Sequence, residues 1–184
     1  MEEKKSRKFA VILVAAAGIA ILMLAAGVIL SHRKATVFTI AILASDPDRI
    51  DCGALEEQFT ETAGTEDHPL TVSVTAYDPA EKENDQKLLA DLRSHIVDLL
   101  IAEETVFTVF ADRQCFGSLK DVLPADWPKG YYRWVPNGYP AYGIRIPDSG
   151  RIGMPDEKRY QYVAGISIAS EHKEAAARVL LSLL

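Results

Sequence analysis

The stretch Val37-Phe-Thr-Ile-Ala-Ile-Leu43 is apolar at every position except Thr39 and rich in β-branched side chains. This composition is typical of a β-strand that is covered on both faces. The stretch from Ile96 to Ala102 repeats the pattern and is interrupted only by Asp98. Between the two, residues Leu70 to Tyr77 alternate apolar and polar side chains, which indicates a strand with one less buried face. We therefore expect two central strands and one edge strand.

Helical patterns separate these strands. Asp46-Pro-Asp48 stops the first strand and predicts the start of a helix whose inner face carries Leu55 and Phe59. A second helix, over residues 78–93, begins with Asp-Pro-Ala-Glu, in which the aspartate caps free amides and the glutamate reaches back as in a capping box. A third helix is predicted over residues 104–113.

This alternation of strands and helices predicts an α/β fold with a mainly parallel sheet and right-handed crossovers. Because the second strand is the least buried, we expect the spatial order 2-1-3 within a three-layer lobe. Residues 117–155 are rich in turns, with a short strand at Tyr142 to Ile146. A last strand at Tyr160 to Ala169 is followed by a helix capped by Ser170. Its buried face comprises Ala175, Ala176, Val179, Leu180 and Leu183.

The N-terminal region carries a predicted membrane anchor. Residues Phe9 to Leu30 contain no charged side chain and no proline. A helix of this length, rising about 1.5 Å per residue, crosses a hydrocarbon core of roughly 30 Å. Four basic residues precede the stretch, whereas only Arg33 and Lys34 follow it, which favours a cytoplasmic N-terminus. Cleavage after the small residues Ala25 and Ala26 is the alternative to an uncleaved signal anchor.

These features predict four segments. Residues 1–8 form a cytoplasmic tail, 9–30 a transmembrane helix, 31–35 a linker, and 36–184 one extracytoplasmic domain. The expected location is the cell membrane, with a single pass.

The domain is acidic. Residues 35–184 hold 14 basic and 24 acidic residues, a net charge of −10. This charge argues against nucleic acid or anionic lipid as the partner of the domain. The plainer explanation of the charge is an acidic, solvated surface that keeps the domain soluble. Cys52 and Cys115 both follow the predicted span, where the compartment permits oxidation. A disulfide between them and two buried free thiols are the two alternatives, since a bridge requires Cα atoms within about 7 Å.

Polar side chains cluster where the predicted strands end. In an open parallel sheet, ligands bind outside the carboxyl ends of the strands, close to helix N-termini. Carboxylates and hydroxyls in these loops suit a cation, an amine or a sugar hydroxyl, although helix capping explains the same residues. The candidate ligand residues are Ser45, Asp46, Tyr77, Asp78, Glu103 and Glu104.

Aromatic residues concentrate in the turn-rich segment, among them Trp134, which we add to the candidate ligand residues. Flat rings with polar tips stack on sugars or anchor protein interfaces, whereas the plainer explanation is that they cover the sheet. Catalytic patterns are lacking: the sequence has no phosphate loop, no Gly-x-Ser-x-Gly elbow, no glycine-rich dinucleotide turn and no zinc spacing among its four histidines. We therefore expect neither an enzyme nor a cofactor or metal.

Five segments carry a family resemblance, which rests on their order. They are Phe38-Thr-Ile-Ala-Ile-Leu43, Val72-Ser-Val-Thr-Ala-Tyr-Asp-Pro79, Val97-Asp-Leu-Leu-Ile-Ala102, Gly117-Ser-Leu-Lys-Asp-Val-Leu-Pro124 and Gly165-Ile-Ser-Ile-Ala-Ser-Glu-His-Lys-Glu-Ala-Ala176. In this order the chain resembles one lobe of bacterial extracellular solute-binding proteins of the type II periplasmic-binding-protein-like class, the receptors of ABC importers. The resemblance covers about residues 36–123 and 160–184.

The chain departs from the family pattern in ways that change the function we expect. The resemblance implies a second lobe after Leu123, but only residues 124–159 stand in its place, which is too few for a lobe. The chain is thus expected to be a membrane-anchored, non-enzymatic binding domain that meets a small molecule or a protein partner, such as a transporter subunit. The alternative is a structural or accessory membrane protein that keeps the fold and has lost ligand binding.

Overall fold

The computed structural model describes residues 36–123, 133–134, 141–154 and 161–184. The predicted tail, span and linker, residues 1–35, lie outside the described residues. Within the described part of the chain, no helix has the length and apolar character needed to cross a membrane. Residues Thr36–Leu184 form one compact unit, and the description below concerns this unit alone.

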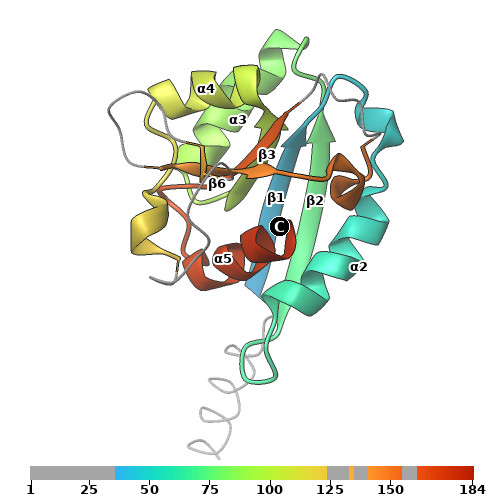
Figure 1. Cartoon of the computed structure of the whole chain (residues 1–184), viewed down its shortest axis with the longest axis vertical. Helices are drawn as coiled ribbons and strands as arrows, with labels where there is room; N and C mark the ends of the chain where they lie inside the picture. The colour runs from blue at the N-terminus through green and yellow to red at the C-terminus, as the bar shows by residue number, and fades with distance from the viewer. Residues whose placement is uncertain (1–35, 124–132, 135–140, 155–160) are drawn as a thin grey trace, which may run out of the picture. The chain divides into compact units, whose positions relative to one another are not determined.

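One mixed sheet organises the unit, in the order β2-β1-β3-β6-β5-β4 (Figure 1). Strand β1 pairs in parallel with both β2 and β3, so the predicted order 2-1-3 is confirmed. The strands are β1 (Thr36–Leu43), β2 (Leu70–Tyr77), β3 (Leu99–Glu103), β4 (Arg133–Trp134), β5 (Gly143–Ile146) and β6 (Tyr162–Ile166).

The prediction of a mainly parallel sheet is wrong beyond β3. Strand β6 is antiparallel to β3, β5 is antiparallel to β6, and β4 is antiparallel to β5. A parallel neighbour requires a crossover, usually a helix, whereas an antiparallel one does not. The described part of the connection from β5 to β6 contains only the short 3-10 turn η3 (Ser149–Ile152), which is consistent with an antiparallel return.

Helices cover both faces of the sheet and confirm the three layers (Figure 1). Helices α2 and α5 pack on one face, in a cluster with Phe38, Ile40 and Ile42 of β1. Helices α3 and α4 pack on the other face, in a cluster with Ala41 and Leu43. The helices are α2 (Cys52–Ala63), α3 (Lys82–Arg93), α4 (Glu104–Asp112) and α5 (Lys173–Ser182), with 3-10 turns η1 (Pro47–Arg49) and η2 (Leu119–Asp121).

Three predicted helix starts differ from the observed ones. Asp46-Pro-Asp48 leads into η1 only, and α2 begins later because Asp51 accepts a hydrogen bond from the amide of Ala54 at 3.0 Å. Asp78 binds the amide of Ala80 at 2.7 Å in a tight turn, which delays α3 to Lys82. Ser170 does not occupy the cap of α5, because the helix begins at Lys173 with His172 in the cap position, and the Ser170 hydroxyl donates to Asp98.

Side chains of α2 cover the outer edge of β2. The amide of Val72 donates to Thr60 Oγ1 at 3.1 Å, and the amide of Val74 donates to Glu56 Oε1 at 2.8 Å. Glu56 and Thr60 are four residues apart and therefore lie on one face of the helix. Two main-chain donors of this edge strand are thus satisfied within the unit.

Two facing glycines make room for an aromatic ring between the sheet and α4. Gly143 of β5 pairs with Gly165 of β6. A Cβ atom at Gly165 would lie 2.6 Å from Phe107 Cζ, and one at Gly143 would lie 3.0 Å from the same atom. Phe107 is fully buried and stacks on Phe116 with ring centroids 4.3 Å apart. The ring fills the space that the missing side chains leave.

Gly165→Ala is expected to destabilise the unit by about 2 kcal/mol, because the added methyl group must displace a buried ring. Gly117→Ala is a matched control, since its Cβ would meet nothing closer than the Cα of Ile168 at 3.9 Å. The measurement is urea unfolding of the full chain in detergent, followed by circular dichroism. Equal midpoints for the two variants would contradict the packing assignment.

Candidate functional site

The carboxyl ends of the parallel strands, where ligand residues were predicted, bring one pair of them together. Ser45, after β1, donates its hydroxyl to Glu103 Oε1 at 2.7 Å, and Glu103 ends β3. Asp46 instead pairs with Arg49 at 2.7 Å within η1. Ser45 and Glu103 thus contact each other across two strands, whereas Asp46 contacts only a residue of the turn that it precedes.

The remaining predicted ligand residues have local partners as well. The Tyr77 ring lies under the ammonium of Lys87, 5.6 Å from the ring centroid. Asp78 closes the turn before α3, as described above, and its carbonyl accepts from Asn84 Nδ2 at 3.1 Å. Both residues therefore fasten the start of α3 to the end of β2. Trp134 lies in β4, but its side chain is outside the described residues.

Glu104 forms a two-pronged ion pair with Arg145 of β5. Its Oε1 lies 2.8 Å from Arg145 Nη2, and its Oε2 lies 3.2 Å from Arg145 Nε. This hydrogen bonding with Glu104 raises the pKa of Arg145 above its ordinary value, so the guanidinium stays charged. About a third of each side chain is exposed, which places the pair at the surface, where water weakens its contribution.

The carboxyl edge is therefore a set of separate polar pairs. Asp46 and Glu104 are engaged in ion pairs, Asp78 closes a tight turn, and the hydrogen bond between Ser45 and Glu103 joins the ends of β1 and β3. Across the residues that the structure describes, no three His, Cys, Asp or Glu side chains are grouped to hold a metal ion.

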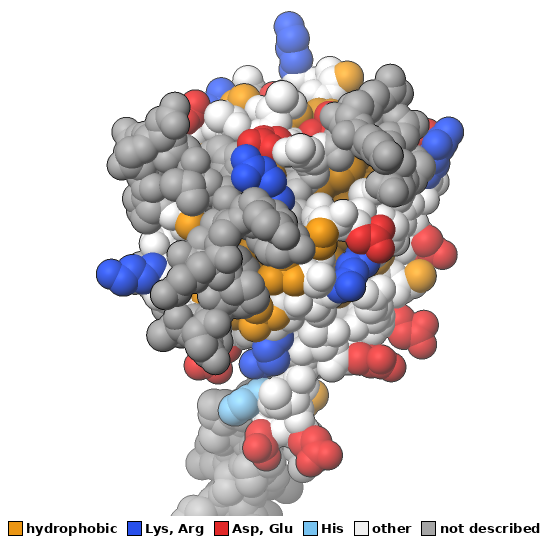
Figure 2. Space-filling view, in the orientation of Figure 1, with side chains coloured by type: hydrophobic (Ala, Val, Ile, Leu, Met, Phe, Trp, Pro, Cys, Tyr) orange, Lys and Arg blue, Asp and Glu red, His pale blue; other side chains and the backbone are white. Residues whose placement is uncertain are grey.

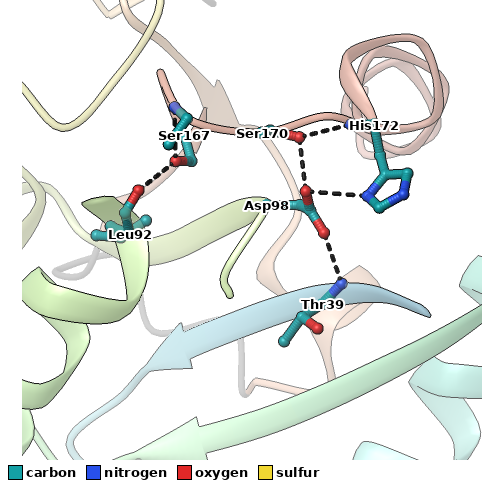
Figure 3. A network of polar contacts seen from close by, with 7 residues as sticks. Thr39, Leu92, Asp98, Ser167, Ser170 and His172 are labelled. Carbon is teal, nitrogen blue, oxygen red and sulfur yellow. Dashed lines mark hydrogen bonds and ion pairs between the residues drawn. The ribbon is translucent and has the colours of Figure 1, made fainter. Parts of the chain in front are cut away.

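A more elaborate arrangement lies at the opposite end of the strands, around Asp98 (Figure 3). Asp98 precedes β3 and is 2% exposed. Its Oδ2 accepts from the amide of Thr39 in β1 at 3.0 Å. Its Oδ1 accepts from the hydroxyl of Ser170 at 2.7 Å and lies 3.1 Å from His172 Nδ1. A buried carboxylate is tolerated only with such compensation.

The backbone supports the same junction. The amide of Asp98 donates to the carbonyl of Thr39 at 2.9 Å, and the amide of Ser167 donates to the carbonyl of Asp98 at 2.8 Å. Ser167 Oγ in turn donates to the carbonyl of Leu92 at the end of α3, at 2.6 Å. One buried residue thus ties together β1, β3 and the connection from β6 to α5.

The network fixes the ring of His172. Since Asp98 is the acceptor, Nδ1 is assigned the hydrogen, and Nε2 lies on the other side of the ring. Phe38 holds the imidazole by an edge-to-face contact, with centroids 6.2 Å apart and planes at 88°. Ser170 donates to Asp98 and accepts from the amide of His172 at 3.0 Å. This differs from a catalytic triad, in which the serine hydroxyl bonds to the imidazole.

His172 lines a surface groove of about 460 Å³. The groove lies at the amino ends of β1 and β2, between the first turns of α5 and the connection from α2 to β2. Its walls carry charges of both signs. The lining residues are Thr36, Thr65, His68, Leu70, Glu171, His172, Lys173, Glu174, Ala175 and Arg178.

The sequence contains one signal for this site. Asp98 is the single charged residue in an otherwise apolar strand, and such a residue needs buried partners. Its partner His172 lies 74 positions away, so no spacing rule connects the two. Ser170 was predicted as a helix cap, which concealed its contact with Asp98.

The two cysteines are free thiols in the structure. Cys115 is buried in the cluster of α3 and α4, whereas Cys52 packs against the cluster on the other face of the sheet. The disulfide alternative is therefore not the one observed, because the sheet lies between the two clusters. Burial raises the pKa of the Cys115 thiol, against an opposing effect of Arg93. The thiol is thus less nucleophilic than an exposed one.

Comparisons with protein-family models, curated proteins and solved structures found no match.

Asp98→Ala is expected to destabilise the unit by about 3 kcal/mol or more, because it leaves the Thr39 amide and the Ser170 hydroxyl without their acceptor. Asp112→Ala, at an exposed position of α4, is the control and should change the stability by no more than about 0.5 kcal/mol. Thermal and urea unfolding of the full chain in detergent measure both values. Similar losses in the two variants would show that the Asp98 contacts contribute little.

Proposed function

We propose that this chain is a membrane-anchored, non-enzymatic domain outside the cytoplasm that binds a partner protein. The anchor rests on the sequence: Phe9 to Leu30 is free of charge and long enough to cross a bilayer. The orientation rests on the excess of basic residues before it over Arg33 and Lys34 after it.

The observation that carries the proposal is that all described strands of residues 36–184 belong to one sheet. The domain resembles one lobe of a solute-binding protein, in the order of β2, β1 and β3 and in the return from β6 to α5. A receptor with two lobes holds its ligand by closing them together. A single lobe offers only an open surface. On such a surface a partner protein can form a large contact area, whereas a small solute cannot be enclosed.

The carboxyl edge supports this preference. In a solute receptor, the polar groups of this edge hold the ligand, but here Asp46, Asp78 and Glu104 are engaged with neighbouring residues. Acidic and basic side chains are interspersed on the face shown in Figure 2. Such a surface suits a polar protein interface, in which charges give specificity.

The second candidate is an accessory protein that keeps the fold for structural reasons and has no ligand. The same local pairs at the carboxyl edge favour it, since they stabilise turns without any bound molecule. The two candidates differ in whether the domain contacts a defined neighbour through this edge.

Topology is tested by cysteine labelling in intact cells. Glu66→Cys, in an exposed loop, is placed in a Cys52→Ser background, in which the remaining Cys115 is buried. An impermeant maleimide is expected to label this variant before lysis and to leave the background protein unlabelled. Labelling that appears only after lysis would reverse the proposed orientation.

Partner binding is tested by photo-crosslinking in native membranes. A photoreactive amino acid at Asp48, exposed beside the carboxyl edge, is expected to give one adduct of defined size. The control position is Glu57, which is exposed on α2. The adduct at Asp48 should weaken with Glu103→Ala, which changes the same edge. Equal adducts at both positions, or none at either, would favour the accessory role.

A further inference from the structure

The groove at the amino ends of β1 and β2 has properties that the proposed function does not use. The Asp98 network holds His172 at its wall, and the side chain keeps 20% of its surface exposed. Burying a carboxylate is costly, and here the carboxylate fixes one ring nitrogen of a histidine that borders an open groove. A carboxylate that binds one ring nitrogen in this way orients the imidazole toward a ligand at its other nitrogen.

The other groove residues limit the chemistry of a ligand. Arg178 is half-buried, and one of its terminal nitrogens donates to the carbonyl of Ala63, so its guanidinium is held in place. Lys173 adds a second positive charge. These two groups offer hydrogen-bond donors to an anionic oxygen, and a carboxylate matches the planar guanidinium. His172, whose Nδ1 hydrogen faces Asp98, offers Nε2 as an acceptor instead.

Negative charges line the same groove. Glu171, just before α5, and Glu174, in its first turn, are exposed and line the groove. A ligand with only negative charge would meet repulsion from both. An ammonium group, in contrast, would find carboxylate acceptors within the same groove. The lining therefore matches a molecule that carries charges of both signs.

The size of the groove fits such a molecule. Ligand sites usually have volumes of about 300 to 1,000 Å³, and this groove has about 460 Å³. Leu70 and Ala175 give it an apolar part for a short side chain.

We infer that this groove is a binding site for a small zwitterion, of the size of a dipeptide, whose carboxylate meets Lys173 and Arg178 and whose ammonium meets Glu171, Glu174 and Nε2 of His172. The site lies at the end of the strands opposite to the one at which ligands were predicted. It goes beyond the proposed function, since it requires neither the anchor nor the protein partner.

The test uses the full chain in detergent, in a buffer without carboxylates. Dialanine is titrated by calorimetry, with acetate, methylamine and inorganic phosphate as separate probes. Dialanine is expected to bind saturably and at least tenfold more tightly than any of the three. In parallel, dialanine should shift the imidazole NMR signal of His172 and leave that of His95 unchanged, because His95 lies outside the groove.

Variants assign the contacts. His172→Gln and Lys173→Ala are each expected to weaken dialanine binding at least tenfold, and Glu174→Gln should weaken it by a similar factor. His95→Asn, exposed and outside the groove, is the control and should bind as the parent does. Lys173 and Glu174 are also exposed, so these two variants stay informative even if His172→Gln lowers stability.

Three results would overturn the inference: no dialanine binding by the parent protein, phosphate or acetate binding as tightly as dialanine, or unchanged affinity in the Lys173 and Glu174 variants. None of these depends on topology or crosslinking. A negative binding result would therefore refute the zwitterion site without bearing on the proposed function.

Discussion

The buried carboxylate of Asp98 is the contact on which the arrangement of the domain depends. It receives hydrogen bonds from β1 and from the connection between β6 and α5, and it directly precedes β3. It thereby joins the parallel part of the sheet to its antiparallel part at one point. Since an unpaired charge in this position would be costly, the chain can close its sheet only with Ser170 and His172 in register. This polar residue thus acts together with the β3–β6 ladder in placing the last strand and helix.

Local patterns in the sequence were sufficient for the first half of the fold. The apolar runs that became β1 and β3 and the alternation in β2 predicted the order 2-1-3, because burial alone separates central strands from edge strands. The antiparallel placement of β6 could not be predicted, since it depends on contacts between residues 59 to 67 positions apart. Helix starts failed where an aspartate was assigned to a helix cap but made a turn, as Asp78 does.

The candidate site residues likewise divide into those that local patterns could predict and those that depend on long-range contacts. Ser45 and Glu103 could be placed together because the ends of adjacent strands meet at one edge. The Asp98 site could not, because its residues come from the start of β3 and from the segment before α5, which no sequence pattern connects. The two ends of the sheet consequently differ: one carries separate polar pairs, such as Ser45 with Glu103, and the other holds a histidine in a fixed orientation beside an open groove.

The pairing of Glu56 and Thr60 with the amides of β2 has a consequence for assembly. An edge strand with free main-chain donors recruits further strands, either from partner segments or from other copies in aggregates. Here α2 occupies those donors with its own side chains. The sheet is therefore closed to strand addition along this part of β2, and an associating protein must recognise side chains. The same protection limits self-association through this edge of the sheet.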